Sequence, residues 1–264
     1  FVSGEADPAF ARDTEGTNAD DRALHQLIDA PNLMVKIPGT SEGLPSIRTL
    51  IGEGRSINVT LIFSVPRYVE VVEAYISGLE DAVANGIEDL SQIASVASFF
   101  ISRTDTEVDR RLQEIGTDQA LELRGKTAVA QAQVAYQQFL SAFSGARWEA
   151  LAAKGAQPQR PLWASTSTKN PNYSETLYDD ELIGPHTVNT MPDNTIDAFI
   201  TSVSVKRSID ADPEASELIL RKVAEIRIDL EHVAAVLEEE GVASFVKSFD
   251  ELIATLTSKA DQLL

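Results

Sequence analysis

The 264-residue chain carries 41 acidic and 22 basic residues, which gives a formal charge of −19 at pH 7. Such a surface repels nucleic acids and anionic membranes and argues against both as partners, although solubility alone is a sufficient reason for the acidity. The absence of cysteine excludes disulfides and thiol chemistry, and the three histidines are scattered without metal-ligand spacing.

Short apolar runs along the chain alternate with longer stretches of helical period. Strands are expected at 1–3, 33–37, 57–63, 93–101, 162–165 and 187–191. Helices are expected in "SEGLPSIRTLIGEG" (41–54) and in "VPRYVEVVEAYISGLEDAVANG" (65–86), where apolar residues recur every three or four positions. This alternation is typical of βα units around a parallel sheet.

The second half of the chain is predicted to be mostly helical. Two or more helices are expected over 106–154, followed by a polar loop rich in turn formers over 165–186. From Glu214 onward the period is helical again, with a break expected at Gly241 because glycine commonly ends a helix. No linker divides the chain, so a single domain is expected. With neither a signal-peptide pattern nor a run of about 20 apolar residues, the expected location is the cytoplasm.

The beginning of the chain predicts further residues upstream. It opens on "FVSGEADPAF", an apolar pair without a methionine, which is typical of the middle of a strand.

Polar side chains stand at the ends of successive predicted strands. The strand order predicts part of a (β/α)₈ barrel, a fold in which the chemistry lies at the carboxyl ends of the strands. We therefore expect the following residues to converge on one site: Glu5, Lys36, Asn58, Thr60, Ser98, Arg103, Ser167 and Lys169.

Lys36 is unusual because it lies inside the apolar run "NLMVKIP". Burial disfavours the charged form of an amine and lowers its pKa, and a neutral amine condenses with a ketone to a Schiff base. The iminium then accepts electrons from a breaking carbon–carbon bond. Glu5 could move protons through a water molecule, which Asn58 and Thr60, on the same side of their strand, could orient.

Arg103, Ser167 and Lys169 supply the charge and hydroxyl donors that suit a phosphate. Each candidate also has an ordinary structural explanation. Lys36 could belong to a wrongly placed strand or snorkel at an edge, Glu5 could be a solvated or capping carboxylate, and Arg103 could begin a charged helix. "NVT" (58–60) matches a glycosylation acceptor, which we take as accidental without a secretory signal. The residues alone therefore indicate a barrel enzyme, either a Schiff-base lyase or a transferase.

Four segments, "VKIPGTSEG", "INVTLIFS", "ASFFISR" and "LWASTSTKNP", resemble the successive strand motifs of transaldolases, in particular the bacterial branch with an "STSTKNP" loop. The similarity extends from "FVSGEADP" to "LEEEGVASFVKSFDELIATL". It implies an α/β fold, a (β/α)₈ TIM barrel of the class I aldolase type, with extra helices. Residues 1–264 would then be one barrel domain holding strands 3–8. The first two βα units, with the family's first-strand aspartate, would lie upstream.

The resemblance also implies the reaction. A dihydroxyacetone unit would move from sedoheptulose 7-phosphate or fructose 6-phosphate to glyceraldehyde 3-phosphate or erythrose 4-phosphate, in the non-oxidative pentose phosphate pathway. Sugar phosphates would be the partners, and neither a metal nor an organic cofactor would be needed. The sequence leaves the oligomeric state open.

Residue roles follow from the same resemblance. Lys36 would form the Schiff base, and Glu5 would be the acid and base, acting through a water that Thr60 helps to hold. The substrate would be contacted by Asn58, Ser98, Phe100, Arg103, Ser167 and Lys169, the last three at its phosphate. Other branches have arginine where this chain has Lys169, so bidentate geometry would be lost there.

Two alternatives stay open. A fructose-6-phosphate aldolase of the same superfamily would release free dihydroxyacetone. Aldolase-type relatives carry a tyrosine where Phe100 stands, so phenylalanine favours transfer, and Phe100→Tyr is expected to raise aldolase activity. The other alternative is a non-catalytic truncated barrel or acidic interaction module, against which the joint presence of the candidate residues argues.

Overall fold

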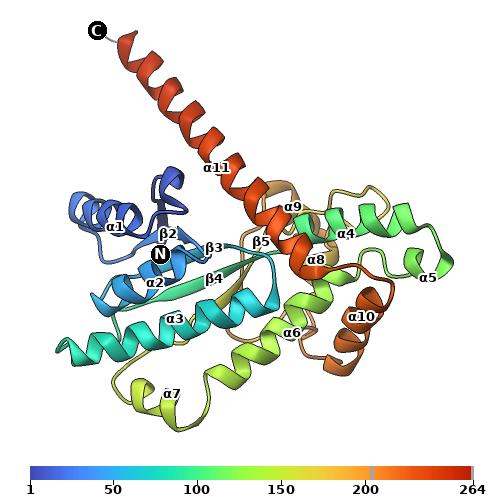
Figure 1. Cartoon of the computed structure of the whole chain (residues 1–264), viewed down its shortest axis with the longest axis horizontal. Coiled ribbons are helices and arrows are strands. Elements are labelled where there is room, and N and C mark those ends of the chain that lie inside the picture. Colours follow the sequence, from blue (N-terminus) through green and yellow to red (C-terminus); the bar gives the residue numbers. More distant parts are fainter. Residues whose placement is uncertain (203–204, 263–264) are drawn as a thin grey trace.

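Six parallel strands form one curled sheet in this computed structural model, which describes residues 1–202 and 205–262. The strands follow one another across the sheet in sequence order, so each connection crosses over one face. The sheet has the shape of a half-barrel (Figure 1). Its strands are β1 (Val2–Glu5), β2 (Leu33–Pro38), β3 (Ile57–Ile62), β4 (Ser95–Phe100), β5 (Arg160–Ala164) and β6 (Val188–Asn189).

The described helices account for most of the rest: η1 (Pro8–Phe10), α1 (Thr14–Ile28), α2 (Gly43–Gly52), α3 (Val65–Ala84), α4 (Ser102–Ile115), α5 (Asp118–Leu121), α6 (Thr127–Ala142), α7 (Gly145–Ala152), α8 (Leu177–Glu181), α9 (Asp193–Ser202), α10 (Pro213–Glu225) and α11 (Leu230–Asp261). The predicted α/β class is confirmed, and all six predicted strands are present, with ends shifted by no more than two residues. Helices α1 and α9 were not predicted. The expected loop over 165–186 contains α8, so that expectation is wrong over this short helix.

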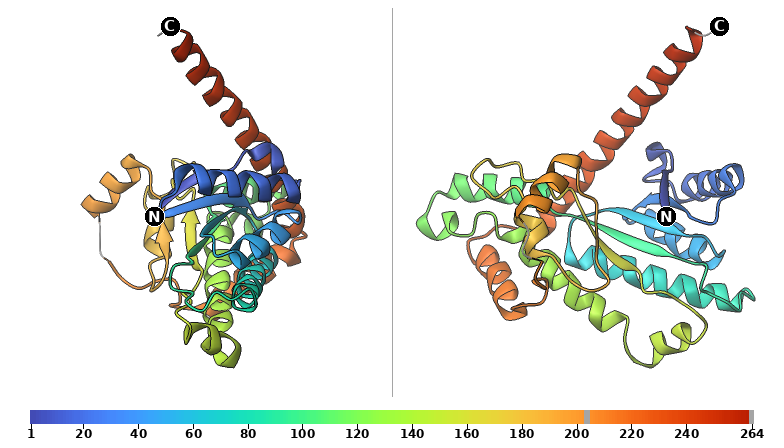
Figure 2. Two further views of the ribbon diagram at one scale, coloured as in Figure 1. Left: turned by 90° about the vertical axis from the view of Figure 1, so that its left-hand side faces the viewer. Right: turned by 180° about the vertical axis from the view of Figure 1, so that it is seen from behind.

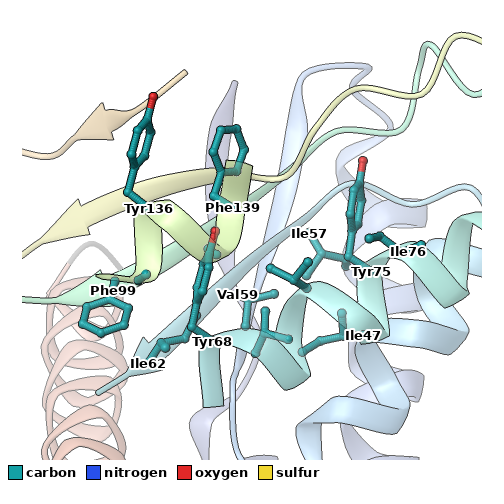
Figure 3. Packing of buried hydrophobic residues seen from close by; sticks show 14 of the residues in the cluster. Ile47, Ile57, Val59, Ile62, Tyr68, Tyr75, Ile76, Phe99, Tyr136 and Phe139 are labelled. Carbon is teal, nitrogen blue, oxygen red and sulfur yellow. The ribbon is translucent and has the colours of Figure 1, made fainter. Parts of the chain in front are cut away.

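The outer face of the sheet packs against α2, α3 and α6. Its strand side chains are those of Ile37, Val59, Ala97, Phe99 and Trp163, all buried. Figure 3 shows Tyr68 and Tyr75 of α3 and Phe139 of α6 in the same cluster as Val59 and Phe99 of the sheet. Helix α3 begins where it does because the Ser64 hydroxyl accepts the Arg67 N–H, with a proline in the first turn. This layer makes the sheet a rigid support for the opposite face.

The inner face of the sheet carries a second apolar cluster. It contains Met34, Val96, Phe100, Leu162 and Ala164 and packs with residues of α4, α10 and α11. Strand β3 changes face within this region. Its register shifts between Val59 and Ile62, and Leu61 has a φ of 58°, as in a β-bulge. As a result Ile62 joins the outer cluster, while Leu61 and Phe63 join the inner one.

Helix α11 runs without interruption through Gly241, so the expected break there is wrong. The chain instead turns between α10 and α11, where Arg227 has a φ of 65°. A Cβ at Gly241 would lie 2.9 Å from Leu61 Cδ2, so this glycine allows α11 to approach β3 closely. Beyond this contact α11 projects away from the body, and residues 250–262 are exposed (Figures 1 and 2). Within residues 1–202 and 205–262, no helix has the length and apolarity needed to cross a membrane.

Candidate active site

Glu5, Lys36 and Asn58 lie side by side on three neighbouring strands, with Glu5 at the carboxyl end of β1 and Asn58 near the start of β3. The β1–β2 register pairs Glu5 with Lys36, and the β2–β3 register pairs Lys36 with Asn58. Paired residues of parallel strands point to the same side of a sheet, and the flanking Val35 and Ile37 are fully buried on the other. Lys36 therefore points to the inner face, where its Nζ lies 4.0 Å from Glu5 Oε1.

The surroundings of Lys36 differ from the sequence-based expectation in one respect. Its side chain is 32% exposed and that of Glu5 is 43% exposed. The expectation of a poorly solvated amine is therefore wrong for the ammonium group, although it holds for the strand that carries it. The physical reason is the alternation of β2, which directs Lys36 into the open interior of the half-barrel while its neighbours enter the outer core.

A chain of hydrogen bonds crosses the sheet beside Lys36. Asn58 Nδ2 donates to Ser3 Oγ at 2.9 Å, and Ser98 Oγ donates to Asn58 Oδ1 at 2.8 Å. Asn58 and Ser98 are buried, so these bonds fix the orientation of the amide. Sequence reasoning found Asn58 and Ser98 but missed Ser3. The available signal was its spacing, two residues before Glu5 on the same face of β1.

Thr60 and Phe100 line the same inner face with different neighbours. Thr60 is buried, pairs with Pro38 and immediately precedes the bulge at Leu61. The ring of Phe100 lies 5.2 Å from that of Phe63, centroid to centroid. The bulge therefore directs Phe63 against Phe100, an arrangement that strict strand alternation does not predict.

Arg103 lies in the first turn of α4, three residues after Phe100, in a helix that starts earlier than the expected position 106. Its guanidinium carbon lies 5.4 Å from the centroid of the Phe100 ring, a cation–π contact. Lys169 Nζ donates to Ser167 Oγ at 2.7 Å. Both contacts are with uncharged groups, so neither contact neutralises the charge of Arg103 or Lys169.

An open cavity of about 650 Å³ brings Arg103 and Lys169 together. Two further arginines, Arg110 and Arg124, line it, and residues of α11 close one side. The cavity is also lined by four acidic residues, Asp105, Glu107, Asp109 and Glu240. Arg110 forms an ion pair with Glu107, so an anionic ligand would be attracted mainly by Arg103, Arg124 and Lys169.

The lining of the cavity includes neither Lys36 nor Glu5. The candidate residues therefore form two neighbouring groups, one around Lys36 and one around Arg103. Ser98, which bonds to Asn58, and Phe100, which contacts Arg103, connect the two groups.

A second polar network anchors the loop that follows β5. Thr166 Oγ1 donates to Asn189 Oδ1 at 3.0 Å, and Asn189 Nδ2 donates to Asp179 Oδ1 at 2.7 Å. Burial raises the pKa of Asp179 to about 6. Sequence reasoning missed this network, because its members are spread over the loop, α8 and β6. In the part of the chain that the structure describes, no three His, Asp or Glu side chains gather to hold a metal ion.

Comparison with known proteins shows which family this chain resembles. Residues 1–256 match the family described as transaldolase/fructose-6-phosphate aldolase. The chain is 51% identical over 262 residues to a transaldolase of Saccharopolyspora erythraea, an alignment that covers 99% of this chain and 71% of that protein. It is 53% identical over 257 residues to a transaldolase of Thermobifida fusca, with 96% and 68% covered. With a transaldolase of Acidothermus cellulolyticus the identity is 51% over 265 residues, with 99% and 70% covered.

Proposed function

This chain belongs to the transaldolase/fructose-6-phosphate aldolase family, and from that premise we propose which residues perform its reaction. Its function is that of a transaldolase, an enzyme that transfers a ketone-bearing unit between sugars. The substrates that we propose are sedoheptulose 7-phosphate or fructose 6-phosphate as donor and glyceraldehyde 3-phosphate or erythrose 4-phosphate as acceptor.

Lys36 is proposed as the nucleophile. Its amine adds to the C2 ketone of the donor and expels water, which gives a protonated Schiff base. The iminium accepts the electrons of the C3–C4 bond, so the first aldose phosphate leaves and a dihydroxyacetone unit stays on Lys36 as an enamine. The enamine then adds to the acceptor aldehyde, and water releases the product. Glu5 relays protons through a water that Thr60 helps to hold. The observation that carries this proposal is the 4.0 Å separation of Lys36 Nζ and Glu5 Oε1 on the inner face.

The remaining residues are proposed to bind the sugar phosphate. Asn58 and Ser98, oriented by their hydrogen bonds, face the hydroxyl groups next to the Schiff base. Phe100 lines the pocket and supports Arg103 through its ring. The phosphate lies between Arg103 and the pair formed by Ser167 and Lys169, where one guanidinium and one ammonium group supply charge-assisted hydrogen bonds. Phenylalanine at position 100 offers no hydroxyl to activate water, which favours transfer over release of dihydroxyacetone.

We further propose that residues 1–264 form a single domain, in which the six strands correspond to strands 3–8 of a (β/α)₈ barrel of the class I aldolase type. Support comes from the consecutive parallel strand order, from the curvature of the sheet and from the alignment of Glu5, Lys36 and Asn58 on its inner face. A cytoplasmic location stays a prediction.

Borohydride trapping tests the proposed nucleophile. Incubation with fructose 6-phosphate and borohydride, followed by peptide mass mapping, should give a reduced adduct on the peptide that contains Lys36. Lys36→Met should abolish the adduct and lower turnover at least about 1,000-fold, because no other group supplies the covalent step. The matched control is Lys154→Met at an exposed site after α7, which should behave as the unmodified chain. An adduct on another lysine, or activity retained in Lys36→Met, contradicts the proposal.

A further inference from the structure

The loop that carries Ser167 and Lys169 is attached to helix α4 at two points. At its start, the Ser102 N–H donates to the Ser165 carbonyl at 3.0 Å, and the two hydroxyl oxygens lie 2.8 Å apart. Further along, the Tyr173 hydroxyl donates to Asp109 Oδ2. Lys169 between these attachments is exposed, so its position depends on them more than on packing.

The second attachment joins three segments of the chain. Asp109 is only 7% exposed, and its Oδ1 accepts the Gly125 N–H at 2.9 Å while Oδ2 accepts the Tyr173 hydroxyl. The Tyr173 ring lies against Gly125, where a Cβ would be 2.8 Å from Tyr173 Cζ and where φ is +68°. Only glycine combines this backbone conformation with so close an approach. Burial and the neighbouring Asp109 raise the pKa of Tyr173, which keeps its hydroxyl protonated as a donor.

A tight turn transmits the position of Tyr173 to Lys169. The Tyr173 N–H donates to the Asn170 carbonyl at 3.1 Å, and the Asn172 N–H donates to Asn170 Oδ1 at 3.0 Å. Asn170 directly follows Lys169 in the chain. At the other end of the connection, Asp109 and Arg103 belong to the same helix, six residues or about 9 Å apart along its axis. The bond between Tyr173 and Asp109 therefore fixes Lys169 relative to Arg103.

We propose that Tyr173, through its hydrogen bond to Asp109, is a positioning residue that holds Ser167 and Lys169 opposite Arg103 before the substrate binds. This inference rests on the proposed function, which assigns those three residues to the phosphate. Without the bond, the exposed loop occupies several positions, and the substrate has to order it on binding. The loss then appears in the binding of phosphorylated substrates and leaves the chemistry at Lys36 unchanged.

The test compares a phosphorylated and an unphosphorylated ligand in Tyr173→Phe, which removes only the hydroxyl. We expect KM for fructose 6-phosphate to rise about 5- to 20-fold with kcat changed less than about twofold, the pattern of lost substrate binding. Trapping of dihydroxyacetone by borohydride, which needs no phosphate, should proceed at the original rate. Asp109→Ala, which removes the acceptor of the Tyr173 hydroxyl, should include the same loss of binding. Adding Tyr173→Phe to Asp109→Ala should then cause no further rise in KM, because both changes break the same hydrogen bond.

Two controls separate this inference from the proposed function. Tyr75→Phe removes another buried phenol hydroxyl, one that donates to the Gln157 carbonyl at 2.7 Å, and should leave both ligands unaffected. Lys169→Met tests the phosphate assignment directly. If Lys169→Met raises KM and Tyr173→Phe does not, or if Tyr173→Phe slows both ligands equally, the positioning role is refuted. If Lys169→Met leaves KM unchanged, the phosphate assignment itself fails.

Discussion

Two ionisable residues, Lys36 on β2 and Asp21 on α1, have opposite environments in this fold. Lys36 points into the open interior, where an amine can meet a substrate. Asp21 on α1 has no exposed surface, and neither carboxylate oxygen has a hydrogen-bond partner among the described residues. Arg55 Nε lies 3.7 Å from Asp21 Oδ1, and His25 Nε2, whose pKa is lowered by burial, lies 3.7 Å from Asp21 Oδ2. Burial raises the pKa of Asp21 to about 7, although Arg55 opposes the change.

Asp21 should therefore make stability depend on pH. Its pKa in the folded state lies above the value of 3.8 expected for the unfolded chain, so the folded state binds the proton more tightly. This contribution to the free energy of unfolding is complete below pH 4 and is lost as the pH rises through about 7. Relative to Asp21→Asn, the unmodified chain should lose on the order of 4 kcal/mol between these limits.

Urea unfolding of both chains at several pH values measures this difference. Asp250→Asn, at an exposed position of α11, is the control and should show no pH-dependent difference. A constant difference between Asp21→Asn and the unmodified chain across the range would show that Asp21 does not titrate as described.

At the scale of elements, the contact between β3 and α11 connects the core to the site. The bulge turns Leu61 toward α11, and Gly241 leaves the space that Leu61 occupies. The same helix supplies Leu237, Glu240 and Ser244 to the cavity that contains Arg103 and Lys169. The seating of α11 on β3 therefore sets one wall of the proposed phosphate site.

Gly241→Ala should destabilise the protein although alanine favours helices. The gain in helix propensity is about 1 kcal/mol, whereas a Cβ 2.9 Å from Leu61 Cδ2 causes overpacking that costs about 1–3 kcal/mol. We expect a net loss of about 1 kcal/mol in the free energy of unfolding, measured by urea denaturation. Ser248→Ala, at an exposed position of the same helix, should be neutral or slightly stabilising. A stabilising effect of Gly241→Ala would mean that α11 adjusts without strain.

At the scale of the whole molecule, acidic residues outnumber basic ones by 41 to 22, and basic residues are found both in surface ion pairs and in the cavity. Arg147, for example, donates to Glu73 and Glu80, while Arg103 and Lys169 are directed into the cavity. Exposed ion pairs of this kind contribute little each, so the net charge of −19 dominates at long range. Self-repulsion should then oppose the folded state at neutral pH.

Salt should consequently stabilise this protein. Raising NaCl from about 20 to about 300 mM shortens the Debye length and screens the repulsion, so Tm at pH 7 should increase by a few degrees. The same series near the isoelectric point of about 4.5 is the control, where the increase should vanish. A decrease of Tm with salt at pH 7 would show that attractive ion pairs outweigh the net charge.

The sequence by itself determined the strands and the candidate residues. Alternating apolar runs and helical periods located all six strands, because local periodicity records which side of an element is buried. The motifs around Lys36, Asn58 and Arg103 gave the family, which the comparisons confirm.

The tertiary structure decided what depends on contacts between distant segments. Four features depend on residues far apart in the chain. They are the change of face in β3, the uninterrupted α11 at Gly241, the bond from Asn58 to Ser3 and the attachment of Tyr173 to Asp109. A glycine that ends a helix and one that admits a neighbouring leucine look alike in a sequence. Only the packing distinguishes them, because the difference lies in the atoms that approach from elsewhere.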